Sequence, residues 1–499
     1  SQFLTVNTLG VWPQYDGTYE SKQKRWTYLA RIDHKINEGQ TAFFRWAAED
    51  EYRPIITTGG RTHSTASFDF AVPRSSAVAG HTWVKSQQSI NDFRIQYAFA
   101  KFKVAPPNSN GDWEPGDFGT DRLSLCTPIF TYPSLTLGGC GNSQMGPEKR
   151  FQIRDDFSHI RGRHAFKAGF DGSMVNFQFD NMGSPLGSWT FPRDVPYNAA
   201  DPTTYPTQYT NSLPTYGDTP IKVLGLYVQD DWTPTDGLTF NIGLRYDRQF
   251  GSYNEDIADL LSRVEDKLGR DGAFPLPIPF HQGSDARGDK NNWGPRIGFA
   301  WDPGRNGKTN IRGGYGLFYD NVRTLLNGAE ITWPQSKTIV ISRPTFPDPF
   351  GGKSRDQFVS TAPPNITVNA NDFQSPYAHQ FNLGVSRTLT TDVALTLDAT
   401  MAIRKADRET VDLNLPGQTS RVRPYPQFAR VTNAQSTFDN TFNAVLVKIE
   451  KRMSHNYQVL VSYTYSEAKD DGFTSAAAGA YGFTKVERYG TADRRHRLV

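Results

Sequence analysis

The feature of this sequence that most constrains its fold is an alternation of apolar and polar residues with a period of two. In TFNIGLRY, residues 239–246, the side chains of Phe240 and Leu244 would share one face of an extended strand. Asn241 and Arg245 would share the opposite face. The same alternation recurs in DFRIQYAFA, NIRGGYGLFY, HQFNLGVS and YQVLVSYTYS. The pattern predicts an all-β protein whose strands each carry one apolar face.

The predicted strands pair into hairpins through tight turns. Turn sequences such as Asn37 to Gly39 and Gly304 to Gly307 contain the residue types that turn geometry favours. We predict hairpins at 24–36 with 39–48, 75–86 with 90–103, 149–160 with 163–179, 222–233 with 237–250, 293–303 with 308–320, 375–389 with 392–404, and 440–453 with 456–469.

Long connections separate the hairpins, so short turns alternate with long loops along the chain. A soluble β-sandwich also alternates apolar and polar residues. Its strands usually have about five or six residues, whereas those predicted here have about ten or more. Short periplasmic turns and long extracellular loops are typical of a transmembrane antiparallel β-barrel, which closes because lipid offers no hydrogen-bond partner to a strand edge. The predicted loops are 49–74, 104–148, 180–221, 251–292, 321–374 and 405–439.

Composition excludes several other classes of protein. Hydrophobic residue types make up 37% of the 499 residues, and no stretch approaches the roughly 18 consecutive apolar residues of a membrane-spanning helix. Aromatic residues at 13% are too abundant for a disordered chain. The 54 basic and 51 acidic residues are mixed along the sequence, which gives no nucleic-acid footprint. Tryptophans near predicted strand ends suit the aromatic girdles of a membrane interface: Trp26, Trp83, Trp232 and Trp301.

The two cysteines, Cys126 and Cys140, lie close together in the Gly- and Pro-containing segment LCTPIFTYPSLTLGGCG. No second pair is present to complete a zinc site. We expect a local disulfide, which would imply an oxidising compartment. The alternative is a pair of free thiols.

Four segments resemble the barrel of TonB-dependent outer-membrane receptors. They are LGLYVQDDWTPTDGLTFNIGLRYD (224–247), WGPRIGFAWDPGRNGKTNIRGGYGLFYD (293–320), YGTADRRHRLV (489–499) and RHAFKAGFD (163–171). The resemblance is greatest to the Oar-like branch, in which a carboxypeptidase-regulatory-like domain and a plug precede the barrel. It extends over nearly the whole chain and reports architecture more than substrate.

The resemblance implies a barrel of about 22 strands that is occluded by a plug. It also implies location in the Gram-negative outer membrane and energy coupling through the TonB complex. We expect residues 1–499 to form a partial barrel of about 14 to 16 strands, without the plug and the closing strands. The expected partners are outer-membrane lipid, the plug of the same full-length chain, the TonB complex through a segment N-terminal to Ser1, and an unknown ligand, but no nucleic acid.

No catalytic set, metal site or cofactor site emerges from the sequence, so we do not expect an enzyme. DPGRNGKT (302–309) lacks the first Gly of a P-loop and precedes a strand, which favours a β-turn. His159 and His164 flank a tight turn, where solvated side chains are favoured over a metal pair. In the acidic pairs 155–156, 230–231 and 470–471, neighbouring strand residues would point to opposite faces and could not share a proton.

Binding is the chemistry that remains. A polar lumen would be lined by alternate strand residues and would contact a plug. Aromatic residues of the long loops suit contact with sugars or peptides, although such residues also pack on one another. The lumen candidates are Arg94, Gln96, Arg154, Asn241, Arg245, Arg312 and Asn382, and the loop candidates are Trp113, Tyr132, Trp189 and Tyr205.

Two functional hypotheses follow. The first is a TonB-dependent receptor that imports, or helps to export, a bulky ligand such as a glycan, a peptide or a metal chelate. The alternative is a passive porin or surface adhesion barrel that is not coupled to TonB. A plug with a TonB-interacting segment before the barrel would distinguish the first from the second.

Overall fold

The computed structural model describes residues 2–56, 60–105, 127–139, 144–181, 183–253, 288–321, 328, 330–332, 337–416, 421–472, 487–490 and 493–499. Nearly all the regular structure in these ranges is β-strand. Within them, no helix has the length and apolar character needed to cross a membrane.

All the predicted hairpins are confirmed, and most of their strands extend further toward the loops than the sequence pattern indicated. Their strands are β3 (Lys24–Asn37) with β4 (Gln40–Arg53), β6 (Arg74–Ser86) with β7 (Ser89–Ala105), β10 (Gln144–Arg161) with β11 (His164–Asn181), β14 (Thr215–Thr235) with β15 (Leu238–Phe250), β16 (Trp293–Trp301) with β17 (Thr309–Tyr319), β20 (Tyr377–Thr388) with β21 (Val393–Asp412), and β22 (Val431–Ser454) with β23 (Tyr457–Asp470).

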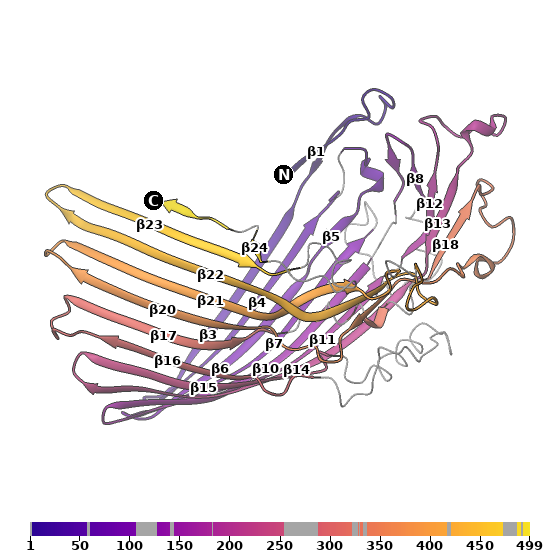
Figure 1. The fold of residues 1–499 in the computed structure, drawn as a ribbon. Coiled ribbons are helices and arrows are strands. Elements are labelled where there is room, and N and C mark those ends of the chain that lie inside the picture. Colours follow the sequence, from indigo (N-terminus) through magenta and orange to yellow (C-terminus); the bar gives the residue numbers. More distant parts are fainter. Residues whose placement is uncertain are drawn as a thin grey trace.

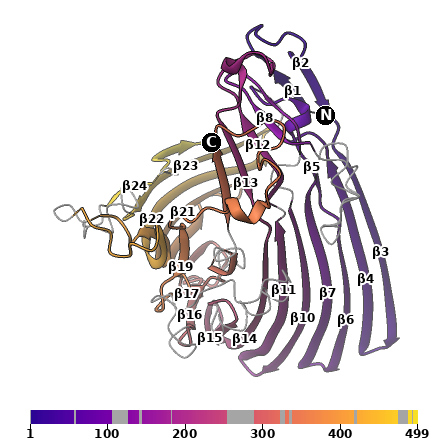
Figure 2. The ribbon, with the colours of Figure 1, turned by 90° about the vertical axis from the view of Figure 1, so that its right-hand side faces the viewer.

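These long strands form one antiparallel sheet with barrel topology, called the barrel sheet below. Successive strands pair in the order β3-β4-β6-β7-β10-β11-β14-β15-β16-β17-β20-β21-β22-β23. The tight turns gather at one end of the sheet and the long connections at the other (Figure 1). The strands are tilted and curve around a common interior (Figure 2).

The β22–β23 turn illustrates how local sequence fixes a hairpin. Ser454 pairs with Tyr457, so the loop contains only His455 and Asn456. Both loop residues have positive φ, 54° and 63°, as a type I′ turn requires. The twist of such a turn matches the twist of the flanking strands. A register shift between Lys451 and Ser454 then separates the turn from the regular pairing of the rest of the hairpin.

The long connections carry regular structure that the sequence analysis did not predict. A second sheet, called the loop-end sheet below, has the strand order β18-β13-β12-β8-β9 and lies at the loop end of the barrel sheet (Figure 2). Its strands are β8 (Ile129–Thr131), β9 (Thr136–Leu137), β12 (Ser184–Thr190), β13 (Gln208–Ser212) and β18 (Thr338–Ser342).

The remaining elements are short. β1 and β2 pair with each other, and β5 lies against β4 and β7. β19 pairs with β22 in parallel, and β24 and β25 pair with β23. Their bounds are β1 (Gln2–Val6), β2 (Gly17–Ser21), β5 (Asp69–Ala71), β19 (Ile366–Asn369), β24 (Arg488–Tyr489) and β25 (His496–Leu498), and the 3-10 helices are η1 (Ser64–Ala66), η3 (Pro202–Thr204) and η6 (Arg355–Phe358).

Apolar burial is concentrated at the loop end. One cluster joins the loop-end sheet to neighbouring loops through Trp189, Phe191 and Tyr209. Another joins the N-terminal hairpin to the same sheet through Trp12 and Leu135. The long strands instead expose their apolar side chains on the outer face of the sheet.

Candidate functional site

The two faces of the barrel sheet have opposite chemistry. Val228 and Leu383 are 59% and 56% exposed and lie on the outer face. The inner face follows from the pairing register, because residues that pair directly across strands share a face. One such row is Arg94–Arg154–Asp171.

All the lumen candidates from the sequence lie on this inner face. The row through Arg94 and Arg154 continues to Gly225 and Asp247, two residues from Arg245 on the same strand. A second row runs Asn241–Gly298–Gly314–Asn382. Gln96 and Arg312 lie an even number of residues from members of these rows, which gives them the same orientation.

Several strands carry an ion pair between residues i and i+2 on the inner face. Arg31 Nη2 lies 2.6 Å from Asp33 Oδ1, and Arg245 Nη2 lies 2.8 Å from Asp247 Oδ1. β7 and β10 repeat the arrangement with 2.7 Å contacts in Arg94–Asp92 and Arg154–Asp156. Since residues two apart on a strand point the same way, each strand supplies its own counter-charge to the lumen.

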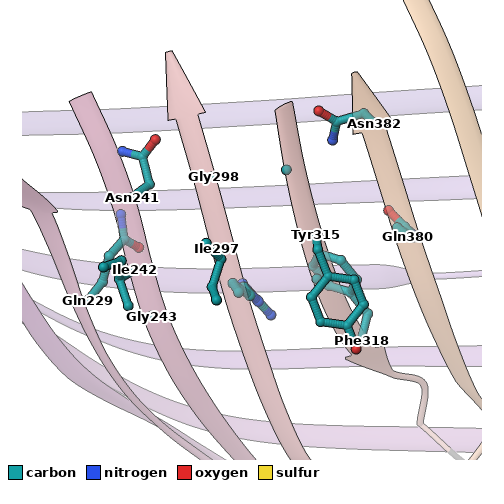
Figure 3. A pocket seen from close by; sticks show the side chains of 13 residues that line it. Gln229, Asn241, Ile242, Gly243, Ile297, Gly298, Tyr315, Phe318, Gln380 and Asn382 are labelled. Atoms are coloured by element: carbon teal, nitrogen blue, oxygen red, sulfur yellow. The ribbon is translucent and has the colours of Figure 1, made fainter. Parts of the chain in front are cut away.

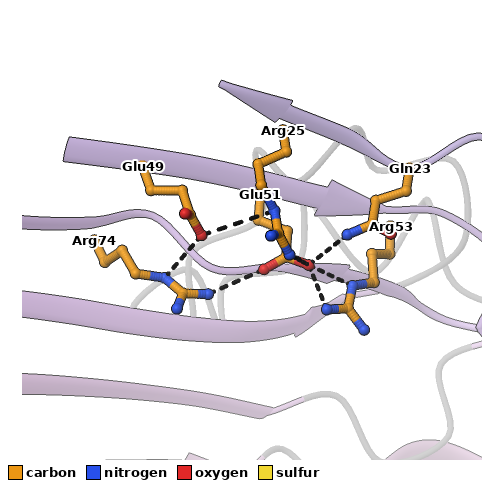
Figure 4. A network of polar contacts seen from close by, with 6 residues as sticks. All are labelled: Gln23, Arg25, Glu49, Glu51, Arg53 and Arg74. Atoms are coloured by element: carbon orange, nitrogen blue, oxygen red, sulfur yellow. Dashed lines mark hydrogen bonds and ion pairs between the residues drawn. The ribbon is translucent and has the colours of Figure 1, made fainter. Parts of the chain in front are cut away.

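A denser network surrounds Glu51 at the loop end of β4 (Figure 4). The Glu51 side chain is 1% exposed and accepts hydrogen bonds from Arg25 and Arg74, each at 3.0 Å. Arg53 also donates to Glu51, and Gln23 Nε2 donates at 2.7 Å. This one carboxylate therefore joins β3, β4 and β6 with the segment between β2 and β3.

The guanidinium groups of this network remain open to solvent on one side. The side chains of Arg25, Arg53 and Arg74 are 49%, 44% and 47% exposed. A shallow groove of about 340 Å³ is lined by Arg74 and in part by the small residues Ala47 and Ser76. This part of the wall therefore combines one buried carboxylate, that of Glu51, with a solvent-exposed basic surface.

The opposite stretch of wall, across β14 to β20, has a different composition (Figure 3). A shallow groove of about 270 Å³ has Gly298 and Gly314 among the residues that line it, together with the carboxamides of Gln229, Asn241, Gln380 and Asn382. These amides offer paired donors and acceptors to polar, uncharged groups.

Arg296 is the cation of the same groove. Its guanidinium lies 4.5 Å from the centre of the Phe318 ring. No carboxylate of the described residues lies within ion-pair distance of Arg296. Phe318 in turn lies over Gly316, where a Cβ atom would come 2.6 Å from the ring.

The loop candidates from the sequence have distinct environments. Trp189 is 2% exposed and packs against Tyr209, so its ring has no free face. The Tyr132 ring stacks on Phe191 at 4.7 Å. Tyr205 is 38% exposed, and its hydroxyl donates to the Ala199 carbonyl at 2.8 Å. Trp113, Cys126 and Cys140 lie outside the described residues.

Two titratable groups anchor the loop end. Burial alone would raise the pKa of Asp194, but hydrogen bonds from the backbone and hydroxyl of Ser134 and from the Trp12 indole lower it. His63 lies 2.6 Å from the Tyr19 hydroxyl, and burial lowers the pKa of its imidazole. Both groups connect the N-terminal hairpin region to the loops.

The chemical alternatives raised by the sequence have structural explanations. Asp155 accepts from Asn91, whereas Asp156 pairs with Arg154, so the two carboxylates face opposite sides of the sheet. His164 bonds Asp230 at 2.7 Å. In the turn at 302–309, Asp302 accepts from the Gly307 backbone. The described residues contain no group of three or more side chains able to hold a metal ion.

Sequence reasoning missed Glu51 and Arg296. The partners of Glu51 lie on separate strands, and no short motif connects them. Arg296 sits in an alternating strand like several other arginines, and only the register shows that its neighbours are glycines and amides.

Comparisons with known proteins match this architecture. A family model described as an outer membrane beta barrel domain matches residues 4–499. The TonB-dependent transporter Oar of Myxococcus xanthus is 26% identical over 246 residues, which are 45% of this chain and 19% of that protein.

Solved structures agree on the fold. The outer membrane transporter YddB from Escherichia coli has a TM-score of 0.58 at 12% identity, over 91% of this chain and 49% of that chain. The ferripyoverdine receptor of Pseudomonas aeruginosa has a TM-score of 0.52 at 11% identity, over 96% of this chain and 52% of that chain. The chain thus spans about half the length of these solved structures.

Proposed function

We propose, from the premise that this chain belongs to the outer membrane beta barrel domain family and resides in the Gram-negative outer membrane, that it forms the wall of a TonB-dependent transporter. The transporter would carry a bulky ligand, such as a glycan, a peptide or a metal chelate, through the barrel lumen. Import is the proposed direction of transport. Help with export is the alternative that the resemblance to the Oar-like branch implies.

The observation that carries this proposal is the polar inner face. An ion-paired surface around Glu51 and an amide and glycine surface around Arg296 line the same interior. Such a surface suits reversible contact with a hydrogen-bonding plug or ligand, because the charges around Glu51 are already paired and the amides around Arg296 offer both donors and acceptors. We propose that Arg94, Gln96, Arg154, Asn241, Arg245, Arg312 and Asn382 contribute to these contacts.

We further propose that residues 1–499 form one barrel unit of a longer protein. Coverage of 49% and 52% of the solved structures supports this division. A plug and closing strands of the same full-length chain would complete the lumen, and the TonB complex would act through a segment outside these residues. The named relatives are transporters and receptors, which supports a role in passage rather than in catalysis.

Two measurements on the full-length protein test the proposal. Purified protein should bind the periplasmic domain of TonB from the same organism in a pull-down. In proteoliposomes it should not admit arabinose or stachyose in a swelling assay, because a plug would occlude the lumen. A sugar-permeable barrel that fails to bind TonB would instead establish the passive porin.

The same preparation can narrow the ligand class. Equilibrium dialysis against mixtures of oligosaccharides, oligopeptides and ferric siderophores should retain one class. Asn382→Leu should weaken retention, because it removes a carboxamide from the groove shown in Figure 3. Thr400→Leu, which pairs with Asn382 but lies outside the groove lining, is the matched control.

A further inference from the structure

The outer face of the barrel sheet has a groove where two hairpins meet, β10 with β11 and β14 with β15. Ala168 lies between Phe157 and Val228 in one cross-strand row, and Val228 pairs with Leu244. Because the alanine side chain ends at Cβ, the larger side chains of Phe157 and Val228 project further from the sheet on either side of Ala168. The resulting groove has a volume of about 420 Å³, and its apolar lining is Phe157, Phe166, Ala168, Val228, Ile242 and Leu244.

This groove lies in the apolar band of the membrane-facing surface. Phe157, Phe166 and Val228 are 42%, 43% and 59% exposed. In a membrane barrel such side chains contact acyl chains rather than water. A narrow groove in that band suits a flexible chain one methylene wide, whereas the flat face of another protein would leave it empty.

Polar groups lie at the turn end of the groove. The His164 ring stacks on Phe166 and on Trp232, with centroids 5.4 and 5.7 Å apart, and its Nδ1 lies 2.7 Å from Asp230. Such an aromatic and polar layer is typical of the boundary between acyl chains and headgroups. Ala168 is four residues further along β11 than His164, or about 13 Å at the rise of a strand.

Two arginines complete this end. Arg161 pairs with His164 across the turn and is exposed, and Arg163 is exposed in the turn itself, where it donates to the Pro234 carbonyl. Guanidinium groups bind phosphate oxygens strongly. Cations therefore stand at headgroup depth, directly below an apolar groove at acyl depth.

We propose that this groove is a specific binding site for one phospholipid with an anionic headgroup, from the leaflet that meets the short turns. One acyl chain lies along Ala168 between Phe157 and Val228. The phosphate is bound by Arg161 and Arg163, beside the His164–Asp230 pair. No covalent step is involved, and the site does not depend on the transported ligand.

The test uses the full-length protein, purified in detergent and offered equal amounts of phosphatidylglycerol and phosphatidylcholine with the same acyl chains. Native mass spectrometry counts the lipid retained. The protein should retain phosphatidylglycerol preferentially, and Ala168→Trp, which fills the groove, should reduce retention about tenfold. Ala399→Trp, the same change on the outer face of β21, is the control and should retain lipid normally.

A second variant separates the headgroup from the chain. Arg161→Gln with Arg163→Gln should abolish the preference for phosphatidylglycerol over phosphatidylcholine, whereas Arg452→Gln, at an exposed residue near the turn end of β22, should not. Ala168→Leu gives a smaller filling group if the tryptophan variant fails to fold, and it should also reduce retention. Equal retention by the Ala168 and Ala399 variants, or an unchanged headgroup preference in the double variant, would overturn the proposal.

Discussion

The barrel sheet and the loop-end sheet are built from the same kinds of residues, but the loop-end sheet buries apolar side chains and the barrel sheet buries charged ones. In the loop-end sheet and its flanking loop, Trp189 and Phe191 are 2% and 3% exposed. In the barrel sheet, Leu383 is 56% exposed while Glu51 is 1% exposed. The first sheet hides its rings from water, and the second turns its apolar side chains outward and encloses its charges.

The difference shows that the surrounding solvent decides which face of a strand is buried. A sheet in water is stabilised when apolar area is removed from the solvent. A sheet in lipid is not stabilised by burying apolar area, but it must satisfy the hydrogen bonds of every polar group internally. The boundary between the two regimes runs between the long strands and the connections at the loop end (Figure 1).

The largest expected effect is on the loop-end sheet. Trp189→Ala should destabilise it by about 3–5 kcal/mol, because the substitution opens a cavity among Phe346, Tyr209 and their neighbours. Limited proteolysis of the full-length protein should then cut the loops while the barrel stays intact. Tyr205→Ala, at a ring that is 38% exposed, is the control with little effect. Equal protease resistance of both variants would contradict the presence of an apolar core in the loop-end sheet.

The next effect is on the outer face of the barrel sheet. Leu383→Lys should cost about 2–4 kcal/mol, because it places a cation in the acyl region. Leu446→Lys is the matched control, since Leu446 pairs with Asp398 on the inner face and a lysine there meets polar neighbours. Unfolding in denaturant after refolding into lipid vesicles measures both. Similar losses for the two variants would show that the faces do not differ in this way.

Charge burial inside the barrel gives a smaller effect. Glu51→Gln should destabilise the protein by about 2 kcal/mol, because Arg25, Arg53 and Arg74 lose their shared counter-charge but keep partial access to water. Glu49→Gln, at a side chain that is 24% exposed, should cost less than about 1 kcal/mol. The same unfolding assay applies. A Glu51 variant as stable as the parent would mean that the network does not hold these strands together.

The smallest effect depends on pH. Burial lowers the pKa of His63, so between its folded value and the usual value of about 6.5 only the unfolded loop binds the proton. The stability contributed by neutral His63 is therefore present above that window and is lost as the pH falls through it. Proteolysis of the loops should accelerate slightly from pH 7 to pH 5, and His63→Phe should remove this dependence. A pH profile that is unchanged in the variant would assign the effect to another group.

The barrel hairpins were predictable from sequence because each rests on local information. In TFNIGLRY the alternation identifies both faces, and short turns such as Asn37 to Gly39 bring neighbouring strands together. The faces of Asp155 and Asp156 followed from the same period of two.

The loop-end sheet was not predictable in this way. Its strands are as short as Thr136–Leu137, too short to display a period. They also pair across large separations, as Tyr209 does with Ile341. Trp189 was therefore expected to contact ligand, whereas its burial depends on Phe346, more than a hundred residues away in the chain. Glu51 was missed for the same reason, because Arg25 and Arg74 reach it from other strands.

The i to i+2 ion pairs have a consequence for assembly. A strand that carries both Arg154 and Asp156, or both Arg245 and Asp247, is neutral at that position before any neighbour joins it. Hairpins of this kind can be added to a growing sheet one at a time, without transient exposure of an unmatched charge to the membrane. The same property permits duplication or loss of a hairpin during evolution, since its neighbours keep their own counter-charges. The strands tied by Glu51 differ, because Arg25 and Arg74 find their counter-charge on a neighbouring strand.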